Sequence, residues 1–251
     1  MDVFSGYDPW LLLLILAAAV LYSSVGHGGA SGYLAAMGLY GLAPAFMKPA
    51  ALTMNIAVSG LVWWRLYRSG RFNPGLFVPF ALASVPLAFV GGAVKVHDAT
   101  YFLIVGIALW IAGFRMFQHP QDAPATGTPP VWASLAIGGT LGFLSGLTGV
   151  GGGIFLSPVL LFLGWTSMRE NAAIAAAFIF VNSVAGLAGH FTSGAAFPAG
   201  MPPLVAAAFL GGIIGSELAV RRLSPPVLKR LLGMVLFIAG AKLALRGWPV
   251  S

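Results

Sequence analysis

Ten apolar segments follow one another along this chain of 251 residues, separated by short turns. A lipid bilayer has a hydrocarbon core that takes about 20 apolar residues of helix to cross, and most of the segments approach that length. Only 8% of the residues are charged, whereas a soluble domain carries about 25%. The chain is therefore predicted to be an all-α polytopic membrane protein. The segments are Trp10–Val25, Gly28–Ala45, Pro49–Tyr67, Pro74–Val94, Thr100–Phe117, Trp132–Leu147, Gly151–Trp165, Asn171–Phe191, Met201–Val220 and Pro225–Leu245.

Composition excludes several other classes of protein. The formal net charge is +7, but the basic residues stand between apolar segments, where they orient a membrane protein rather than bind nucleic acid. The absence of cysteine excludes disulfides and Cys-ligated metals, no other metal-ligand spacing occurs, and no cofactor is expected. Asp2 and Asp8 precede the first segment without a Lys or Arg, so this segment is predicted to be a retained span rather than a signal peptide.

The chain is predicted to divide into two repeats within a single integral membrane domain. Residues 118–130 are polar and contain several prolines, which makes them a poor helix and a plausible linker. They separate a first transmembrane repeat, residues 1–117, from a second, residues 131–251.

Matching motifs in the two halves support this division. The glycine-rich stretch Gly26–Gly29 has a longer counterpart at Gly149–Gly153, and Ser69-Gly70 has a counterpart at Ser193-Gly194. Any one match in apolar sequence is weak, but the common order and nearly constant spacing of the set indicate an internal duplication.

The basic residues predict how the halves are oriented in the cell (inner) membrane. With ten crossings and the N-terminus outside, nine Lys and Arg residues fall inside and four, Lys48 among them, fall outside. With one crossing per glycine-linked pair of segments, the counts become six and seven, which shows no bias. The positive-inside rule thus favours an inverted-topology repeat of about five segments per half, with the Arg-rich loops 65–71 and 221–230 in the cytoplasm.

The segment after each glycine-rich stretch is unusually short. Gly151–Trp165 has 15 residues, which gives about 22 Å of helix at 1.5 Å per residue. A membrane core is about 30 Å thick. The sequence predicts glycine-broken short helices or re-entrant hairpins at the repeat centres, and the charge count fits either form. Such broken helices at matching positions of two repeats are typical of a transporter's binding site.

Each glycine-rich stretch is predicted to form a bend that binds an anion. Glycine leaves backbone N–H groups accessible, and the N-terminus of the following helix attracts negative charge. Neutral hydroxyl and amide side chains in nearby segments add donors that carry no full charge. The alternative interpretation is close helix packing, because small residues let membrane helices approach each other. The predicted substrate-binding residues are Gly26, His27, Gly28, Gly29, Ser31, Asn55, Thr148, Gly149, Gly151, Gly152, Gly153 and Asn182.

Two residues are weaker candidates for proton coupling. His27 lies inside the first bend and changes charge near neutral pH, although a structural hydrogen bond would also explain it. Glu217 is the only acidic residue deep in an apolar segment, but Arg221 stands one helical turn later, so an ion pair at the membrane edge is the simpler interpretation. His190 closes its segment and is interpreted as interfacial.

The stretch from Leu147 to Pro158 resembles the TauE/SafE family of sulfite-exporter-like membrane proteins. It contains a small-residue run, the G-x-G-G-G pattern at Gly149–Gly153, four apolar or small residues and then proline. The first half departs from this pattern, because Ala30 replaces the third consecutive glycine and no equivalent proline follows. The resemblance covers essentially the whole chain. It implies a secondary transporter of a small sulfur-containing anion, such as sulfite or a sulfonate, that works by alternating access.

Other functions compatible with the sequence are a passive anion channel and a structural membrane subunit. An intramembrane hydrolase using Ser145 and His190 is least favoured, because the residues around Ser145 lack the G-x-S spacing of intramembrane serine proteases. The expected partners are the anionic substrate and the lipid bilayer, and the chain is compatible with a homo-oligomer.

Overall fold

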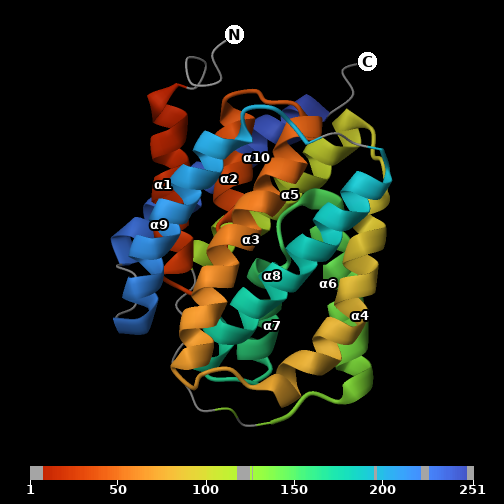
Figure 1. The fold of residues 1–251 in the computed structure, drawn as a ribbon, viewed down its shortest axis with the longest axis vertical. Coiled ribbons are helices and arrows are strands. Elements are labelled where there is room, and N and C mark those ends of the chain that lie inside the picture. Colours follow the sequence, from red (N-terminus) through yellow and green to blue (C-terminus); the bar gives the residue numbers. More distant parts are fainter. Residues whose placement is uncertain (1–7, 118–124, 126, 195–196, 222–225, 248–251) are drawn as a thin grey trace.

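The computed structural model describes residues 8–117, 125, 127–194, 197–221 and 226–247, and ten helices account for nearly all of them (Figure 1). Each predicted segment overlaps one of these helices, and the described residues contain no strand. The prediction of an all-helical fold is therefore confirmed, whereas most of the linker 118–130 lies outside the described residues. The helices are α1 (Pro9–Ser23), α2 (Ala30–Leu39), α3 (Pro44–Arg68), α4 (Pro74–Ala93), α5 (Asp98–Phe117), α6 (Val131–Thr148), α7 (Gly153–Phe162), α8 (Met168–Thr192), α9 (Met201–Arg221) and α10 (Pro226–Gly247).

Four helices in the described part of the chain, α3, α4, α6 and α8, are long and apolar enough to cross a membrane. The 25 residues of α3 correspond to about 38 Å of helix. Large apolar side chains such as Leu82 of α4, Trp110 of α5 and Trp132 of α6 lie exposed on the outside. An apolar exterior of this kind is expected where the surrounding solvent is lipid. The helices and the comparisons below together support a multi-pass membrane protein.

Two helices are much shorter than the rest. Both α2 and α7 have 10 residues, or about 15 Å of helix, which is half of a membrane core. In Figure 1 the outer ends of α1 and α2 lie together at the top of the molecule, while those of α6 and α7 lie together at the bottom. Each glycine bend therefore joins two helices into a hairpin, α1 with α2 and α6 with α7. The open ends of the two hairpins lie at opposite ends of the molecule.

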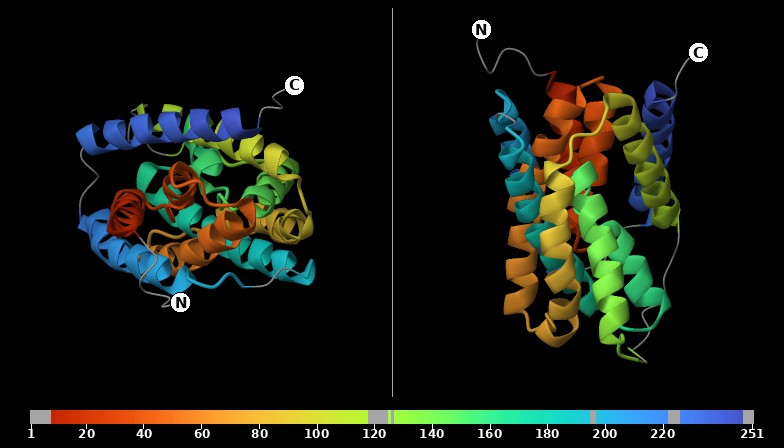
Figure 2. Two further views of the ribbon diagram at one scale, coloured as in Figure 1. Left: turned by 90° about the horizontal axis from the view of Figure 1, so that it is seen from above. Right: turned by 90° about the vertical axis from the view of Figure 1, so that its right-hand side faces the viewer.

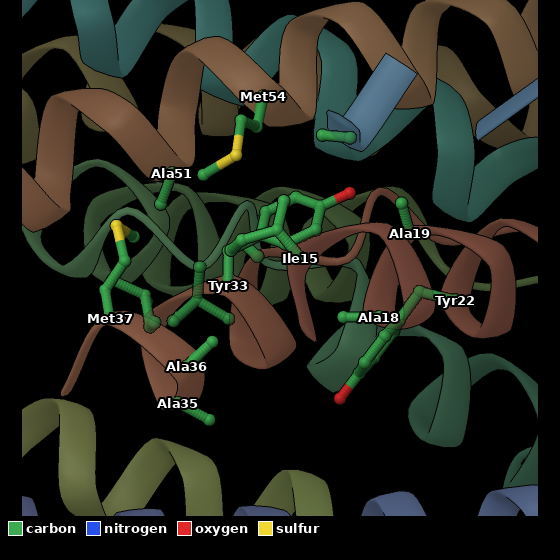
Figure 3. Close-up of a cluster of buried hydrophobic side chains, with 14 of the residues drawn as sticks. Ile15, Ala18, Ala19, Tyr22, Tyr33, Ala35, Ala36, Met37, Ala51 and Met54 are labelled. Carbon is green, nitrogen blue, oxygen red and sulfur yellow. The ribbon is translucent and has the colours of Figure 1, made fainter. Parts of the chain in front are cut away.

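Helix α2 is enclosed by protein. Every residue from Ala30 to Gly38 is buried, as expected for a helix that is apolar on all sides. Figure 3 shows part of this core, in which Tyr22 of α1 and Met54 of α3 contribute to the cluster that surrounds Tyr33 and Met37. A short helix that ends inside a membrane needs such cover, because its terminal backbone groups have no water to bond.

Helices α3 and α8 cross antiparallel at the centre of the molecule, between the two bends. Gly60 of α3 lies against Phe180 of α8, and Leu52 of α3 lies against Gly186 of α8. Seen from above in Figure 2, α10 runs along one side of the molecule, packed on α5 and away from this crossing. The central crossing thus provides the framework on which both bends rest.

Many of the glycines outside the bends allow close helix packing. On α6, glycines four residues apart lie directly against backbone carbonyl groups of the parallel helix α4, and α9 packs in the same way on α1. A side chain at these positions would occupy space that the neighbouring backbone already fills. The packing interpretation therefore holds for the glycines of α6 and α9, which are Gly138, Gly142, Gly146, Gly211 and Gly215.

The structure corrects the expected position of Lys48. The sequence prediction began the third segment at Pro49 and left Lys48 in an outside turn, but α3 begins at Pro44 and encloses Lys48. Proline is favoured in the first turn of a helix, where its missing N–H is not needed. A lysine therefore lies buried in the second turn of a central helix, 6% exposed.

Candidate functional site

The first bend is a short loop between α1 and α2 that depends on glycine. Gly26 has φ +87° and Gly29, the N-cap of α2, has φ +102°, a conformation that costs other residues about 1–2 kcal/mol. A Cβ atom on Gly26 would lie 2.5 Å from the Cβ atom of Ala172 in α8. The hydroxyl of Tyr33 donates to the carbonyl of Gly28 at 2.6 Å and holds the loop in place.

The second bend has the same character and contains one more left-handed residue. Gly149, Gly151 and Gly152 have φ of +82°, +85° and +76°, and Gly152 is the N-cap of α7. The amide of Gly149 donates to the Ser145 carbonyl at 2.8 Å and so closes α6. The sequence prediction of a sharp bend at each glycine-rich stretch is confirmed by these angles.

Asn55 lies between the two bends and bonds to both sides. Its Oδ1 atom accepts a hydrogen bond from the amide of Ala30, the first residue of α2, at 3.1 Å. Its Nδ2 atom is 3.5 Å from the Val150 carbonyl oxygen in the second bend. A Cβ atom on Gly28 would lie 2.5 Å from Asn55 Oδ1, and one on Gly151 would lie 2.6 Å from Asn55 Nδ2. The two glycine bends, far apart in the sequence, thus meet at one side chain of α3.

Ile179 of α8 completes the contact between the bends. Cβ atoms added to Gly28, Gly151 and Gly153 would lie 3.0, 2.8 and 2.6 Å, respectively, from the Ile179 side chain. Ile179 could not be recognised from the sequence, since an apolar residue in an apolar helix carries no signal. In this structure the side chains of Asn55 and Ile179 fill the space between the bends.

The bends present backbone donors at the starts of α2 and α7. Within the described residues, the amide groups of Gly28, Gly29, Gly151, Gly152 and Gly153 donate to no protein acceptor. The first amides of a helix have no partner inside the helix, and together with the helix dipole they favour a negative charge. Neutral donors of this kind are chemically suited to a negatively charged group.

Three buried side chains near the second bend have polar atoms without a partner in the described part of the chain: Ser145, Asn182 and Ser183. Ser183 Oγ is 3.5 Å from the Cβ position of Gly151. Asn182 shares one face of α8 with Phe178, whose ring borders Gly152. Leaving a buried polar group unbonded costs about 1–3 kcal/mol.

Two of the predicted side-chain contacts are already used within the protein. The hydroxyl of Ser31 donates to the hydroxyl of Tyr22 at 2.8 Å. The hydroxyl of Thr148 donates to the Leu144 carbonyl at 2.7 Å and accepts from the Val150 amide at 3.2 Å. These two residues shape the bends, whereas the amide of Asn182 bonds to no partner among the described residues.

His27 links the first bend to the second hairpin. Its Nε2 atom lies 3.0 Å from Ser157 Oγ of α7, and its Nδ1 atom lies 3.2 Å from the Val25 carbonyl oxygen. The ring is half-buried. A titratable ring of the first bend therefore contacts α7 beside the meeting point of the bends.

Glu217 contacts an arginine that the sequence did not suggest. Its carboxylate lies 3.4 Å from Arg65 of α3, and nearly half of its side chain is exposed. The side chain of Arg221, the expected partner, lies outside the described residues. The contact with Arg65 favours the structural interpretation of Glu217 over a role in proton coupling.

Neither a metal centre nor a Ser–His dyad occurs among the described residues. No group of three or more His, Asp or Glu residues is placed to hold a metal ion. Ser145 Oγ and His190 Nε2 are both buried without a partner, so the two do not bond to each other as a hydrolase dyad requires.

The architecture defines a multi-pass helical membrane protein whose two hairpin bends meet in its interior. Comparisons with known proteins give the family. The model of the family described as sulfite exporter TauE/SafE matches residues 11–243, and the chain belongs to this family of membrane transporters. No solved structure matches the chain.

Curated relatives carry transporter names. The probable membrane transporter protein y4hK of Sinorhizobium fredii is 35% identical over 238 residues, which cover 93% of this chain and 96% of the relative. The probable membrane transporter protein YunE of Bacillus subtilis is 26% identical over 183 residues, which cover 73% of this chain and 63% of the relative.

Proposed function

We propose that this protein is a secondary transporter that carries a small sulfur-containing anion, such as sulfite or a sulfonate, across the inner membrane by alternating access. The observation that carries the proposal is the meeting of two glycine bends at Asn55, with free backbone amides at the starts of α2 and α7. The proposed site comprises the amides of Gly28, Gly29, Gly151, Gly152 and Gly153. The predicted role of His27 in proton coupling belongs to the same proposal.

The chemistry of the donors suits an oxyanion. Burying a charge in a low-dielectric region is costly unless hydrogen bonds replace its hydration shell. Backbone amides and the Asn182 amide supply several such bonds without a fixed positive charge that would hold the anion too tightly. Negatively charged oxygen atoms accept stronger hydrogen bonds than neutral groups, so these donors favour an anion over a neutral solute of the same size.

We infer that the two halves are inverted repeats and that each bend lies at the inner tip of a re-entrant hairpin. In the order of the helices, α1, α3 and α4 of the first half correspond to α6, α8 and α9 of the second. Helix α6 packs on α4 as α1 packs on α9, and α3 crosses α8 antiparallel. The hairpins enter from opposite ends of the molecule (Figure 1). Three spans and one hairpin per half agree with the count of basic residues, which requires an odd number of crossings.

Transport requires the bends to separate. Asn55 and Ile179 occupy the space between them, and His27 touches Ser157 across the same contact. Rocking one repeat against the other would open a path to the bends from one side at a time, as in other transporters with inverted repeats.

The topology can be tested at a pair of repeat-related serines. Ser69 ends α3 and Ser193 ends α8, with nearly equal φ of −83° and −78°, and each hydroxyl donates to a carbonyl three residues earlier. The chain has no natural cysteine. In intact cells we expect an impermeant maleimide to label the Ser193→Cys protein but not the Ser69→Cys protein, which should react only after permeabilisation. Equal labelling of both from outside would contradict the inverted topology.

Replacement of Asn182 by leucine separates a binding role from a structural role. Because the amide has no partner within the described residues, Asn182→Leu should leave the melting temperature unchanged or raise it. We expect sulfite transport to fall by about tenfold or more, since one charge-assisted hydrogen bond is lost. The contrasting variant Asn55→Leu should lose both stability and transport, because Asn55 bonds to Ala30. Wild-type transport by Asn182→Leu would remove Asn182 from the site.

The function itself is tested in proteoliposomes with radiolabelled sulfite, sulfonates, sulfate and carboxylates. A carrier should show saturable uptake that responds to an imposed proton or counter-ion gradient. Flux that rises linearly with concentration and ignores such gradients would instead identify a passive channel, and no flux of any sulfur-containing anion would contradict the proposal.

A further inference from the structure

A cavity of about 280 Å³ lies beside the second bend, at the end of the molecule where α3 begins. It is open to the outside and is bordered by the start of α3, the turn after α4, the start of α5 and the ends of α6 and α8. Its lining includes Lys48, Lys95, Asp98, Tyr101 and His190. The volume accommodates a small oxyanion together with several water molecules.

Residues that line the cavity contact the second bend. Tyr101, which lines the cavity, donates from its hydroxyl to the Thr148 carbonyl at 3.0 Å. The Cβ position of Gly149 is 3.2 Å from the carbonyl oxygen of Lys48. An anion held in this cavity would therefore be separated from the bend only by the residues that form the end of α6.

Lys48 has too few partners for a buried ammonium group. Its Nζ atom donates to the carbonyls of Gly92 at 2.9 Å and Gly91 at 3.4 Å, at the end of α4. These contacts cap α4 but carry no full negative charge. No carboxylate within the described residues lies within ion-pair distance of Lys48, although a buried charge normally requires a counter-charge.

The other groups around the cavity add to its preference for anions. His190 is one of its lining residues, and the Nε2 atom of this ring is buried and has no partner in the described part of the chain. Lys95 contributes a second ammonium group, and Asp98 contributes one carboxylate. The lining therefore carries a net positive charge even when the His190 ring is neutral.

We propose that this cavity is an entry site in which Lys48 and His190 bind the anion before it reaches the second bend. The ligand class is a small oxyanion such as sulfite or sulfate. This assignment rests on the proposed function, because it takes the anion bound in the cavity to be the anion that is transported. The cavity lies at the end of the molecule predicted to face outside, so it would serve the outward-facing side.

The test measures anion binding separately from transport. Sulfite and sulfate should raise the melting temperature of the purified wild-type protein in detergent, and Lys48→Met should weaken binding by about tenfold. The conservative variant Lys48→Arg should keep most of the effect. Lys242 provides a matched control, because its Nζ atom also donates to a helix-end carbonyl, that of Leu39, outside the cavity. Lys242→Met should therefore bind the anion as the wild type does.

A second variant keeps the test informative if Lys48→Met does not fold. His190→Phe leaves the contacts between Lys48 and α4 intact and should weaken sulfite binding severalfold. In proteoliposomes, Lys48→Met should raise the half-saturation concentration for anion added on the side of the cavity. Undiminished binding by both variants, or a wild type that neither anion stabilises, would overturn the entry site. Normal anion binding without any flux would instead contradict only the proposed transport.

Discussion

Gly151→Ala is expected to reduce the initial rate of sulfite transport by about a hundredfold. A displacement of binding groups by about 1 Å has an effect of this size where a site depends on their positions. Gly151 has φ +85°, and an added Cβ atom would lie 2.6 Å from Asn55 Nδ2 and 2.8 Å from the Ile179 side chain. These neighbours are side chains that can shift, so the protein should still fold. Their movement would push the two bends apart and displace the backbone donors.

Gly194 offers a matched control for the backbone conformation. It has φ +79°, close to that of Gly151, but no atom lies within 4 Å of its Cβ position. Both alanine variants therefore carry a similar strain of about 1–2 kcal/mol, while only one of them disturbs the contact between the bends. Uptake of radiolabelled sulfite and the melting temperature would be measured for both. Transport by Gly151→Ala at the level of Gly194→Ala would contradict the site assignment.

Gly146→Leu is expected to prevent assembly of the fold, with a loss of stability of about 3 kcal/mol or more. A Cβ atom added to Gly146 of α6 would lie against the carbonyl oxygen of Ala88 in α4 and 2.7 Å from the amide nitrogen of Gly92. The Cα atom of Gly146 lies 3.0 Å from the position of a Cβ atom added to Gly186 of α8. Three helices meet at this glycine. Because the neighbouring atoms belong to backbones, they cannot turn aside as a flexible side chain would.

A leucine on the outer face of the same helix provides the comparison. Thr140 of α6 is exposed, so Thr140→Leu should be tolerated in a lipid environment. Size-exclusion chromatography and thermal unfolding in detergent would be measured for both variants. A monodisperse Gly146→Leu protein with the wild-type melting temperature would show that α4 and α6 do not require this close approach.

The two predictions concern glycines with different physical roles. In the bends, glycine is required by a left-handed backbone, and its neighbours are mostly side chains. On α6 the backbone is ordinary helix, and glycine is required because another helix backbone lies against it. The sequence shows both kinds as the same letter, so their roles could not be distinguished before the helices were placed in space.

The sequence alone determined the helical segments and the two bends. Lipid requires long apolar stretches and internal satisfaction of backbone hydrogen bonds, so hydropathy marks the helices directly. The glycine-rich stretches are local signals of a bend, and the positive φ angles of Gly29 and Gly151 bear this out. Membership of the family was also visible in the motif from Leu147 to Pro158.

Only the tertiary structure decided which residues meet. Asn55 joins both bends, Glu217 pairs with Arg65, and Lys48 lies buried beside a cavity rather than in a turn. Each of these facts depends on contacts between helices that are distant in the sequence, and apolar helices give no local sign of which faces will pack together. Hydrophobicity places a segment in the membrane, but the partner of each polar group is fixed by the packing of the helices, because lipid offers such groups no other bond.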